Sequence, residues 1–214
     1  LGYGYEFGPF VAAEVIDIGH KDPKSVLKRD ENGQQVFDDQ GNPVWVMHIV
    51  SDGIVSNGAE VSPDLSERWG WQPIPCAQPV GNFDGIEVVE ATSDQIPTSD
   101  AEDKDLDGKP DSWPDSWFNP NLKEYVWPGA LQQGASNADN EALYFMNDYS
   151  NKEFHYYPFN GDSTKKGLGL ETEVRLYQWA NPLAEDAIFL VYKISNKSDK
   201  DLDKVTFGMW GDPH

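Results

Sequence analysis

The chain has 214 residues, of which 38% are hydrophobic and 13% aromatic, including eight Trp. Disordered chains are poor in aromatic residues, so this composition predicts a folded, loop-rich protein with an aromatic core. The 37 acidic and 16 basic residues give a net charge of −21, which argues against nucleic acid and anionic membranes as partners. The same charge favours divalent cations, or serves only to keep a secreted protein soluble.

The N-terminal quarter predicts strands separated by turns. Residues 3–7 and 10–16 read as a strand pair that turns at Gly8-Pro9. The polar stretch 20–43 carries two further turn signals, Asn32-Gly33 and Gly41-Asn42-Pro43. Residues 44–50 form a short β-branched and aromatic run, which predicts a buried strand.

Residues 56–135 contain nine prolines, so neither a helix nor a central strand can run far there. Loops of this kind need anchors, and the segment supplies Trp residues at positions 69, 71, 113, 117 and 127. Its Cys76 is the single cysteine of the chain and therefore cannot form an internal disulfide. We interpret it as a passive thiol.

The last third predicts three strands joined by polar turns. Residues 168–177 alternate apolar and polar side chains with period two, which indicates a half-buried antiparallel strand. Residues 187–194 and 205–210 follow as apolar strands, and the three together predict a meander. Residues 141–146 are as plausible a strand as a helix.

These elements predict a mainly β protein, an antiparallel β-sandwich-like domain with a long irregular, calcium-stabilised loop insertion. Residues 1–90 supply its N-terminal strands and loops, residues 91–135 the acidic Pro/Trp-rich insertion, and residues 136–214 the C-terminal β meander of the same domain. The chain lacks a leading Met and stops just after a strand-like run. We therefore expect it to be a fragment of a larger protein.

The sharpest motif is D-x-D-x-D-G-x-x-D at residues 103–111. Calcium prefers six to eight oxygen ligands, and alternate residues of a curled loop aim their oxygens inward while Gly108 allows the sharp turn. The predicted ligands are five Asp side chains and one main-chain carbonyl, from Asp103, Asp105, Asp107, Lys109, Asp111 and Asp115. The alternative is an acidic, solvated loop without an ion.

The loop departs from the EF-hand pattern at its twelfth position. Pro114 stands where a bidentate Glu is usual, and Asp115 is the obvious substitute. Because Pro110 and Pro114 forbid a standard exiting helix, the loop is more similar to the helix-poor calcium loops of thrombospondin type-3 repeats and related bacterial linkers. A second acidic cluster at residues 199–203 lacks the Gly and predicts a solvated turn.

No catalytic motif is present in the sequence, so we expect no enzymatic activity. The four His residues are scattered, and His48 in an apolar strand is expected to be a satisfied core or rim residue. Carboxylate pairs for glycoside hydrolysis remain an alternative, since two acidic residues suffice. The aromatic residues of the insertion could form a sugar-stacking platform or simply anchor it to the sheet: Trp113, Trp117, Tyr125 and Trp127.

Five segments of the chain, in this order and spacing, carry a family resemblance: residues 107–117, 137–148, 167–171, 177–180 and 207–214. Over residues 45–214 the chain resembles the N-terminal region of large, mostly uncharacterised bacterial surface proteins. Many of those end in a type IX secretion sorting domain and carry fibronectin-like modules. The resemblance implies export, an extracellular or cell-surface location, and further domains beyond residue 214, but no reaction.

We therefore expect a non-enzymatic, calcium-binding structural or adhesive component of a bacterial cell surface. Its expected partners are other protein subunits, further domains of the same chain or surface glycans, without nucleic acid or membrane insertion. The alternative is a carbohydrate-binding or glycoside-processing module.

Overall fold

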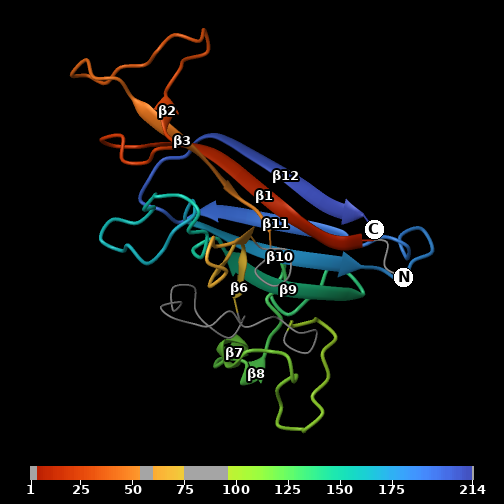
Figure 1. Ribbon diagram of the computed structural model, residues 1–214. Helices are drawn as coiled ribbons and strands as arrows, with labels where there is room; N and C mark the ends of the chain where they lie inside the picture. Colours follow the sequence, from red (N-terminus) through yellow and green to blue (C-terminus); the bar gives the residue numbers. More distant parts are fainter. Residues whose placement is uncertain (1–3, 54–59, 75–95, 214) are drawn as a thin grey trace. The chain divides into compact units, whose positions relative to one another are not determined.

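The computed structural model describes residues 4–53, 60–74 and 96–213, which form a mainly β protein built from antiparallel sheets (Figure 1). The prediction of a mainly β protein with antiparallel sheets is thereby confirmed. The chain divides into two compact units, each assembled from segments far apart in the sequence. The first comprises residues 1–72, 147–170 and 196–214, and the second comprises residues 73–146 and 171–195. Cys76 lies outside the described residues.

The main sheet of the first unit has four strands in the order β12-β1-β3-β2. Their bounds are Gly4–Ile16 for β1, Val26–Leu27 for β2, Trp45–Ser51 for β3 and Asp203–Pro213 for β12. Every pair of neighbours is antiparallel. The predicted buried strand at residues 44–50 is confirmed as β3.

Strand β1 is continuous, so the predicted turn at Gly8-Pro9 is wrong. Pro9 pairs with Met209 of β12, whereas pairing with β3 begins only at Val11. Among the described strands, Pro9 thus lies where β1 is paired on one side only, a place in a sheet where a residue without an N–H is tolerated. The indole nitrogen of the fully buried Trp71 donates a hydrogen bond to the Pro9 carbonyl at 3.1 Å.

Alternation places the core of this unit on one face of the sheet. Val11, Ala13 and Val15 of β1 are buried, as are Met47 and Ile49 of β3. Each of these residues is less than 5% exposed, so this face of the sheet is packed, and Val46 and Glu14 on the opposite face are buried as well.

Both predicted turns between β2 and β3 are confirmed as successive hairpins. Isolated bridges join Arg29 to Gln35 and Phe37 to Pro43. Each turn is closed by an Asp carboxylate that accepts two backbone N–H groups, Asp30 in the first and Asp38 in the second. The two turns therefore use the same local chemistry, eight residues apart.

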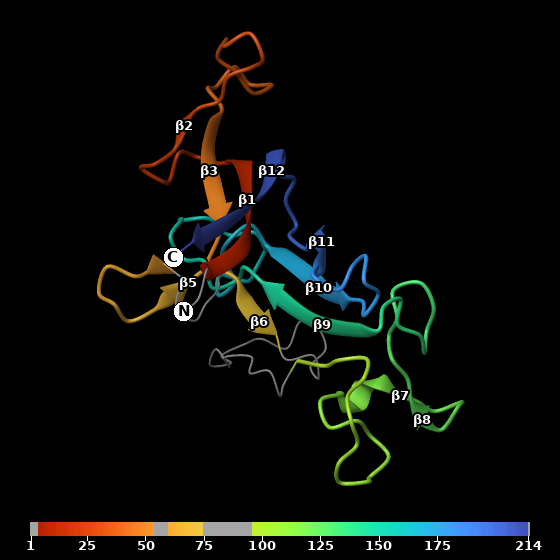
Figure 2. The same cartoon turned by 90° about the vertical axis from the view of Figure 1, so that its right-hand side faces the viewer.

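The second sheet has the order β11-β10-β9-β6, and most of it belongs to the second unit. Its strands are β6 (Gln72–Ile74), β9 (Asn140–Asn147), β10 (Leu170–Gln178) and β11 (Phe189–Asn196). Strands β9, β10 and β11 alternate in direction (Figure 1), and β6 lies beside β9 (Figure 2).

The predicted three-strand meander is corrected by this topology. Strands β10 and β11 are neighbours, but β12 pairs with β1 of the other sheet. The apolar run at residues 205–210 indicates a strand without indicating its partner, since side-chain alternation carries no information about which strand lies beside it. The segment at residues 141–146 is strand, within β9.

Strand β10 is buried on both faces, which overturns the prediction of a half-buried strand. Glu171 and Arg175 stand at the positions expected to face solvent, yet both are less than 10% exposed. Arg175 is held inside because its guanidinium donates to Glu141, at 2.5 Å, and to the Pro128 carbonyl, at 2.8 Å. A buried partner thus overrides the outward preference of a charged side chain.

The described part of residues 56–135 is irregular, as predicted. Besides β6 it holds β4 (Glu60–Val61), β5 (Arg68–Trp69), the short 3₁₀ helix η1 (Asp115–Trp117), β7 (Phe118–Asn119) and β8 (Glu124–Tyr125). None of these elements exceeds three residues. Within the described residues, no helix has the length and apolarity needed to cross a bilayer.

Candidate metal centre

The acidic loop begins from a segment fixed along β9. Ser99 donates its N–H to the Glu141 carbonyl at 2.8 Å, and Leu143 donates to the Pro97 carbonyl at 3.0 Å. The Asn140 side chain also donates to Asp100 at 2.7 Å. The loop entrance is therefore held by strand-like pairing as well as by side-chain hydrogen bonds.

The loop then closes on itself. The N–H of Asp111 donates to the Glu102 carbonyl at 2.9 Å, which ties the two ends together. Between them Leu106 and Gly108 take left-handed backbone conformations, with φ of 61° and 92°. Gly108 adopts that conformation without a steric penalty, in agreement with its predicted role in the sharp turn.

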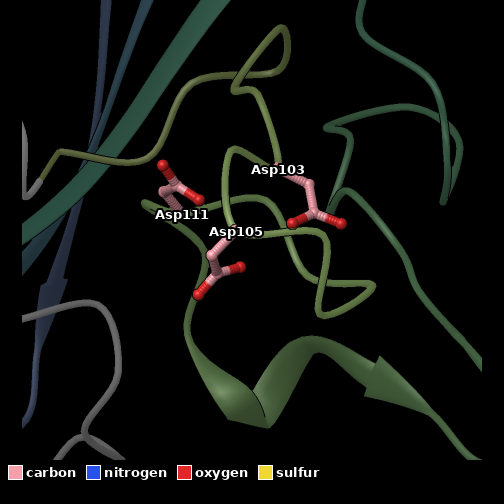
Figure 3. Close-up of side chains that lie close together, drawn as sticks. All are labelled: Asp103, Asp105 and Asp111. Atoms are coloured by element: carbon pink, nitrogen blue, oxygen red, sulfur yellow. The ribbon is translucent and has the colours of Figure 1, made fainter.

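Three carboxylates converge inside this closed loop (Figure 3). Asp103, Asp105 and Asp111 each offer an oxygen, and these oxygens all lie within 4.8 Å of one another. Backbone N–H groups orient all three side chains: Gly108 donates to Asp103 at 2.9 Å, Lys104 donates to Asp111 at 3.0 Å, and Asp107 donates to Asp105 at 3.3 Å. These three residues could hold a metal ion.

The convergence is electrostatically unfavourable without a counter-charge. Two like unit charges about 4 Å apart repel by roughly 1 kcal/mol in bulk water, and by more near a protein surface. Asp105 and Asp111 are exposed and Asp103 is half-buried, so water screens part of this repulsion. A divalent cation among the three oxygens would replace the repulsion with attraction.

Two other predicted ligands, Asp107 and Asp115, do not join this group of three. Asp107 accepts the N–H of Lys109 at 2.8 Å, and Asp115 pairs with the Lys109 ammonium at 2.7 Å. That pairing raises the pKa of Lys109. The structure thus brings together three of the six predicted ligands, while the Lys109 carbonyl stays a predicted ligand. In the second acidic cluster, Asp199 and Asp201 are exposed in the connection before β12, as expected, whereas Asp203 is the first residue of that strand and pairs with Lys28 at 2.6 Å.

The predicted aromatic residues form a small core next to the loop. The ring centroids of Trp113, Trp117 and Trp127 lie 5.3 to 5.7 Å apart, with the planes crossed at 46° to 87°. Tyr125 packs edge-on against Phe118 instead, at 5.3 Å. A sugar-stacking platform needs exposed, aligned ring faces, so this geometry favours the anchoring role.

Two indole N–H groups are used inside this aromatic core. Trp113 donates to the Thr98 carbonyl at 2.8 Å, and the buried Trp127 donates to Glu141 at 3.0 Å. Trp113 therefore ties the exit of the acidic loop to its entrance. The loop is closed twice, once by its backbone and once by this tryptophan.

Sequence reasoning missed a buried carboxylate in the first unit, Asp148. It is fully buried and accepts four hydrogen bonds, from the Ser51 hydroxyl and from the backbone N–H groups of Leu168, Gly169 and Leu170. Burial raises the pKa of Asp148 to about 6, against the lowering effect of these bonds. The turn at residues 167–169 is the signal that could have found it.

His48 and Glu14 form a second polar contact that the sequence did not predict. His48 Nε2 lies 3.1 Å from Oε2 of Glu14, which is itself buried. The His48 side chain is 63% exposed, so it is a satisfied rim residue, as expected.

Comparisons of the chain with family models, with curated proteins and with solved structures give no match. The resemblance to bacterial surface proteins therefore stays a prediction, and the function has to be argued from the geometry.

Proposed function

We propose that the chain is a calcium-stabilised structural or adhesive module of a bacterial cell surface, without enzymatic activity. The convergence of Asp103, Asp105 and Asp111 within one closed loop carries the proposal. Calcium is the expected ion because it accepts carboxylate oxygens in flexible, irregular geometry. The irregular, proline-rich loop suits calcium better than magnesium, because magnesium requires a strict octahedral arrangement of its ligands.

The acidic loop is closed by two sets of contacts, and these indicate which part of it the ion would order. Pairing along β9 and the Trp113 hydrogen bond fix both ends, so the ion orders only the segment between them. Calcium then stabilises the folded form by mass action, since the unfolded chain does not gather the three carboxylates. We infer a mechanical role, in which the ion stiffens a long acidic loop.

An extracellular location accords with the composition. A site with a few exposed carboxylates is expected to bind calcium with a Kd of about 0.1 to 1 mM, the range of extracellular modules. The net charge of −21 would keep such a module soluble and favour cation binding. Partner proteins, further domains of the same chain or surface glycans are the proposed binding partners.

Calcium titration of the whole chain tests the proposal. We expect calorimetry to show saturable binding and the melting temperature to rise with calcium and return with EDTA. Asp105→Asn should weaken binding about tenfold or more, because it removes one of three charged ligands. Asp201→Asn is the matched control, since it removes the same charge from an exposed position in the other unit.

Two results would refute the metal site. One is a melting temperature that does not change between saturating calcium and EDTA. The other is an equal loss of calcium affinity in Asp105→Asn and Asp201→Asn. Such a result would mean that the affinity depends only on the net charge of the chain.

A further inference from the structure

Strand β11 (Phe189–Asn196) forms one edge of the second sheet. In the described part of the chain it has β10 on one side and no strand on the other. An unpaired edge offers a row of N–H and C=O groups to a strand of another chain. The opposite edge is β6, which has only three residues and contains Pro73, so it gives such a strand little to pair with.

The side chains at the start of β11 are apolar and exposed. Ile188, Phe189, Leu190 and Val191 are between 37% and 60% exposed. Because successive residues of a strand point to opposite faces, both faces of this edge carry exposed apolar surface. Edge strands are usually protected by charged residues or Pro, and residues 187–192 contain neither. An unprotected apolar edge of this kind favours association with another strand.

Charged residues of opposite sign flank the apolar run. Glu185 and Asp186 precede it and Lys193 follows it, and all three are exposed. Among the described residues, none of the three has an ion-pair partner. A second copy of the run in the antiparallel direction would bring each charged end to the opposite charge, whereas a parallel copy would place like charges side by side.

Two-fold symmetry restricts how β11 can pair with its own copy. If residue i faces residue j, then j also faces i. The two residue numbers must add up to an even number, because residues directly opposite each other either both point their N–H and C=O groups across the pair or both point them away. With Phe189 on the axis, Leu190 faces Ile188 of the second copy. Lys193 then reaches the turn that holds Glu185 and Asp186. The two neighbouring registers place Lys193 opposite an apolar residue, so the charges favour the register centred on Phe189.

We propose that the chain forms a two-fold symmetric dimer through β11, in which the sheets of two copies join edge to edge. Backbone pairing supplies hydrogen bonds, and residues 188–191 supply the apolar surface that is buried. The two contacts between Lys193 and the acidic turn set the register. The inference goes beyond the proposed function and does not depend on the calcium loop, since no predicted calcium ligand lies in or beside β11.

Sedimentation velocity of the whole chain tests the dimer, with EDTA present so that calcium cannot bridge two acidic copies. An ionic strength of 0.15 M, at which the Debye length is about 8 Å, limits the repulsion between two chains of net charge −21. We expect the mass to double between about 1 and 200 µM chain, a range that brackets the micromolar affinity of a small interface.

Val191→Lys tests the apolar part of the interface. A lysine on an edge strand opposes strand pairing, so we expect the dimer affinity to fall about tenfold or more. Val205→Lys is the matched control and should leave the affinity unchanged. Val205 is exposed to a similar extent, 56% against 50%, but lies in β12, the edge strand of the other sheet. Both valines are exposed, so neither substitution disturbs the core, and thermal melting verifies this.

Exchange of charges between positions 185 and 193 tests the register. Lys193→Glu alone and Glu185→Lys alone each place like charges across the two-fold axis, so each variant should dimerise about tenfold more weakly. An equimolar mixture of the two variants restores both opposite-charge contacts in a heterodimer, and we expect the wild-type affinity to return. A folding defect in either variant could not produce this rescue.

Four outcomes would overturn the proposal. The first is a chain that stays monomeric at about 200 µM, above the micromolar range of small interfaces. The second is equal loss in Val191→Lys and Val205→Lys, and the third is a loss in Val205→Lys alone, which would assign the interface to β12. The fourth is a mixture of Lys193→Glu and Glu185→Lys that associates as weakly as either variant. Because EDTA is present throughout, none of these outcomes bears on the calcium loop.

Discussion

The Cα atom of Gly167 lies against the buried carboxylate of Asp148. A Cβ added to Gly167 would stand 2.7 Å from Cγ of Asp148, well inside van der Waals contact. Gly167 also has a φ of 67°, in the left-handed region. The turn can therefore wrap the carboxylate only with glycine at this position.

Gly167→Ala should destabilise the first unit by about 3 kcal/mol or more. The left-handed backbone alone costs a non-glycine residue roughly 1–2 kcal/mol, and the overlap with Asp148 adds about 1–3 kcal/mol. Urea unfolding followed by tryptophan fluorescence measures the loss. Gly161→Ala is the matched control: its φ is 82°, but a Cβ there would touch nothing within 4 Å. Equal losses in the two variants would show that Asp148 plays no part.

The pH dependence of stability reports on Asp148 itself. Its pKa is about 6 in the folded chain because of burial, against an ordinary 3.8. Between these values the folded state keeps a proton that the unfolded state has lost, so stability falls as pH rises from about 4 to 6. The contribution lost above pH 6 is about 3 kcal/mol, at 1.36 kcal/mol per pKa unit.

Asp148→Asn isolates the contribution of Asp148 to the pH dependence of stability. Asn does not titrate, and the wild type and the variant have all other titratable groups in common. We expect the stability of the wild type relative to the variant to decline between pH 4 and pH 7. Urea unfolding at a series of pH values measures it. A difference that stays constant, or that changes in the opposite direction, would mean that the four hydrogen bonds hold the carboxylate ionised and outweigh burial.

The strands of this protein were largely predictable, whereas their partners were not. Period-two alternation located β10, and a β-branched run located β3, because burial imposes these patterns on sequence. The pairing of β12 with β1 depends on contacts between residues about 200 positions apart, which no local pattern records. The single strand through Pro9 was missed for a related reason, since Pro9 is tolerated only because β3 begins its pairing at Val11.

The sequence predicted that the acidic loop closes on itself, but it predicted only some of the residues that the structure brings together. The spacing of Asp103, Asp105 and Asp111 with Gly108 requires a tight loop, and the structure has one. The pairing of Asp115 with Lys109 was missed because charge spacing does not reveal which opposite charge a carboxylate will choose. Glu14 was missed because a Glu within an apolar strand offers no sign of the Lys28, His48 and Lys204 side chains that other segments bring to it.

Arg175 should be essential for the second unit. Arg175→Met leaves the fully buried Glu141 carboxylate without its cationic partner, although Trp127 still donates to it, and a broken buried pair costs about 3–5 kcal/mol. Urea unfolding is the measurement. Arg175→Lys keeps the charge but cannot contact Glu141, Glu173 and the Pro128 carbonyl at once, so we expect an intermediate loss. A loss below about 1 kcal/mol for Arg175→Met would place the pair among weak surface interactions.

Lys109 should lower the affinity of the acidic loop for calcium if the loop holds the ion. Its ammonium pairs with Asp115, which removes one predicted ligand from the loop and adds a positive charge beside it. Lys109→Met would release Asp115 and make the loop more negative, so calcium affinity should rise several-fold, because ligand charge sets the affinity of such sites. Asp115→Asn in the wild-type background should change affinity little, whereas the double variant should lose the gain. Calorimetric titration of the three variants measures their calcium affinities. A lower affinity in Lys109→Met would show that the lysine stabilises the loop rather than competes with calcium for Asp115.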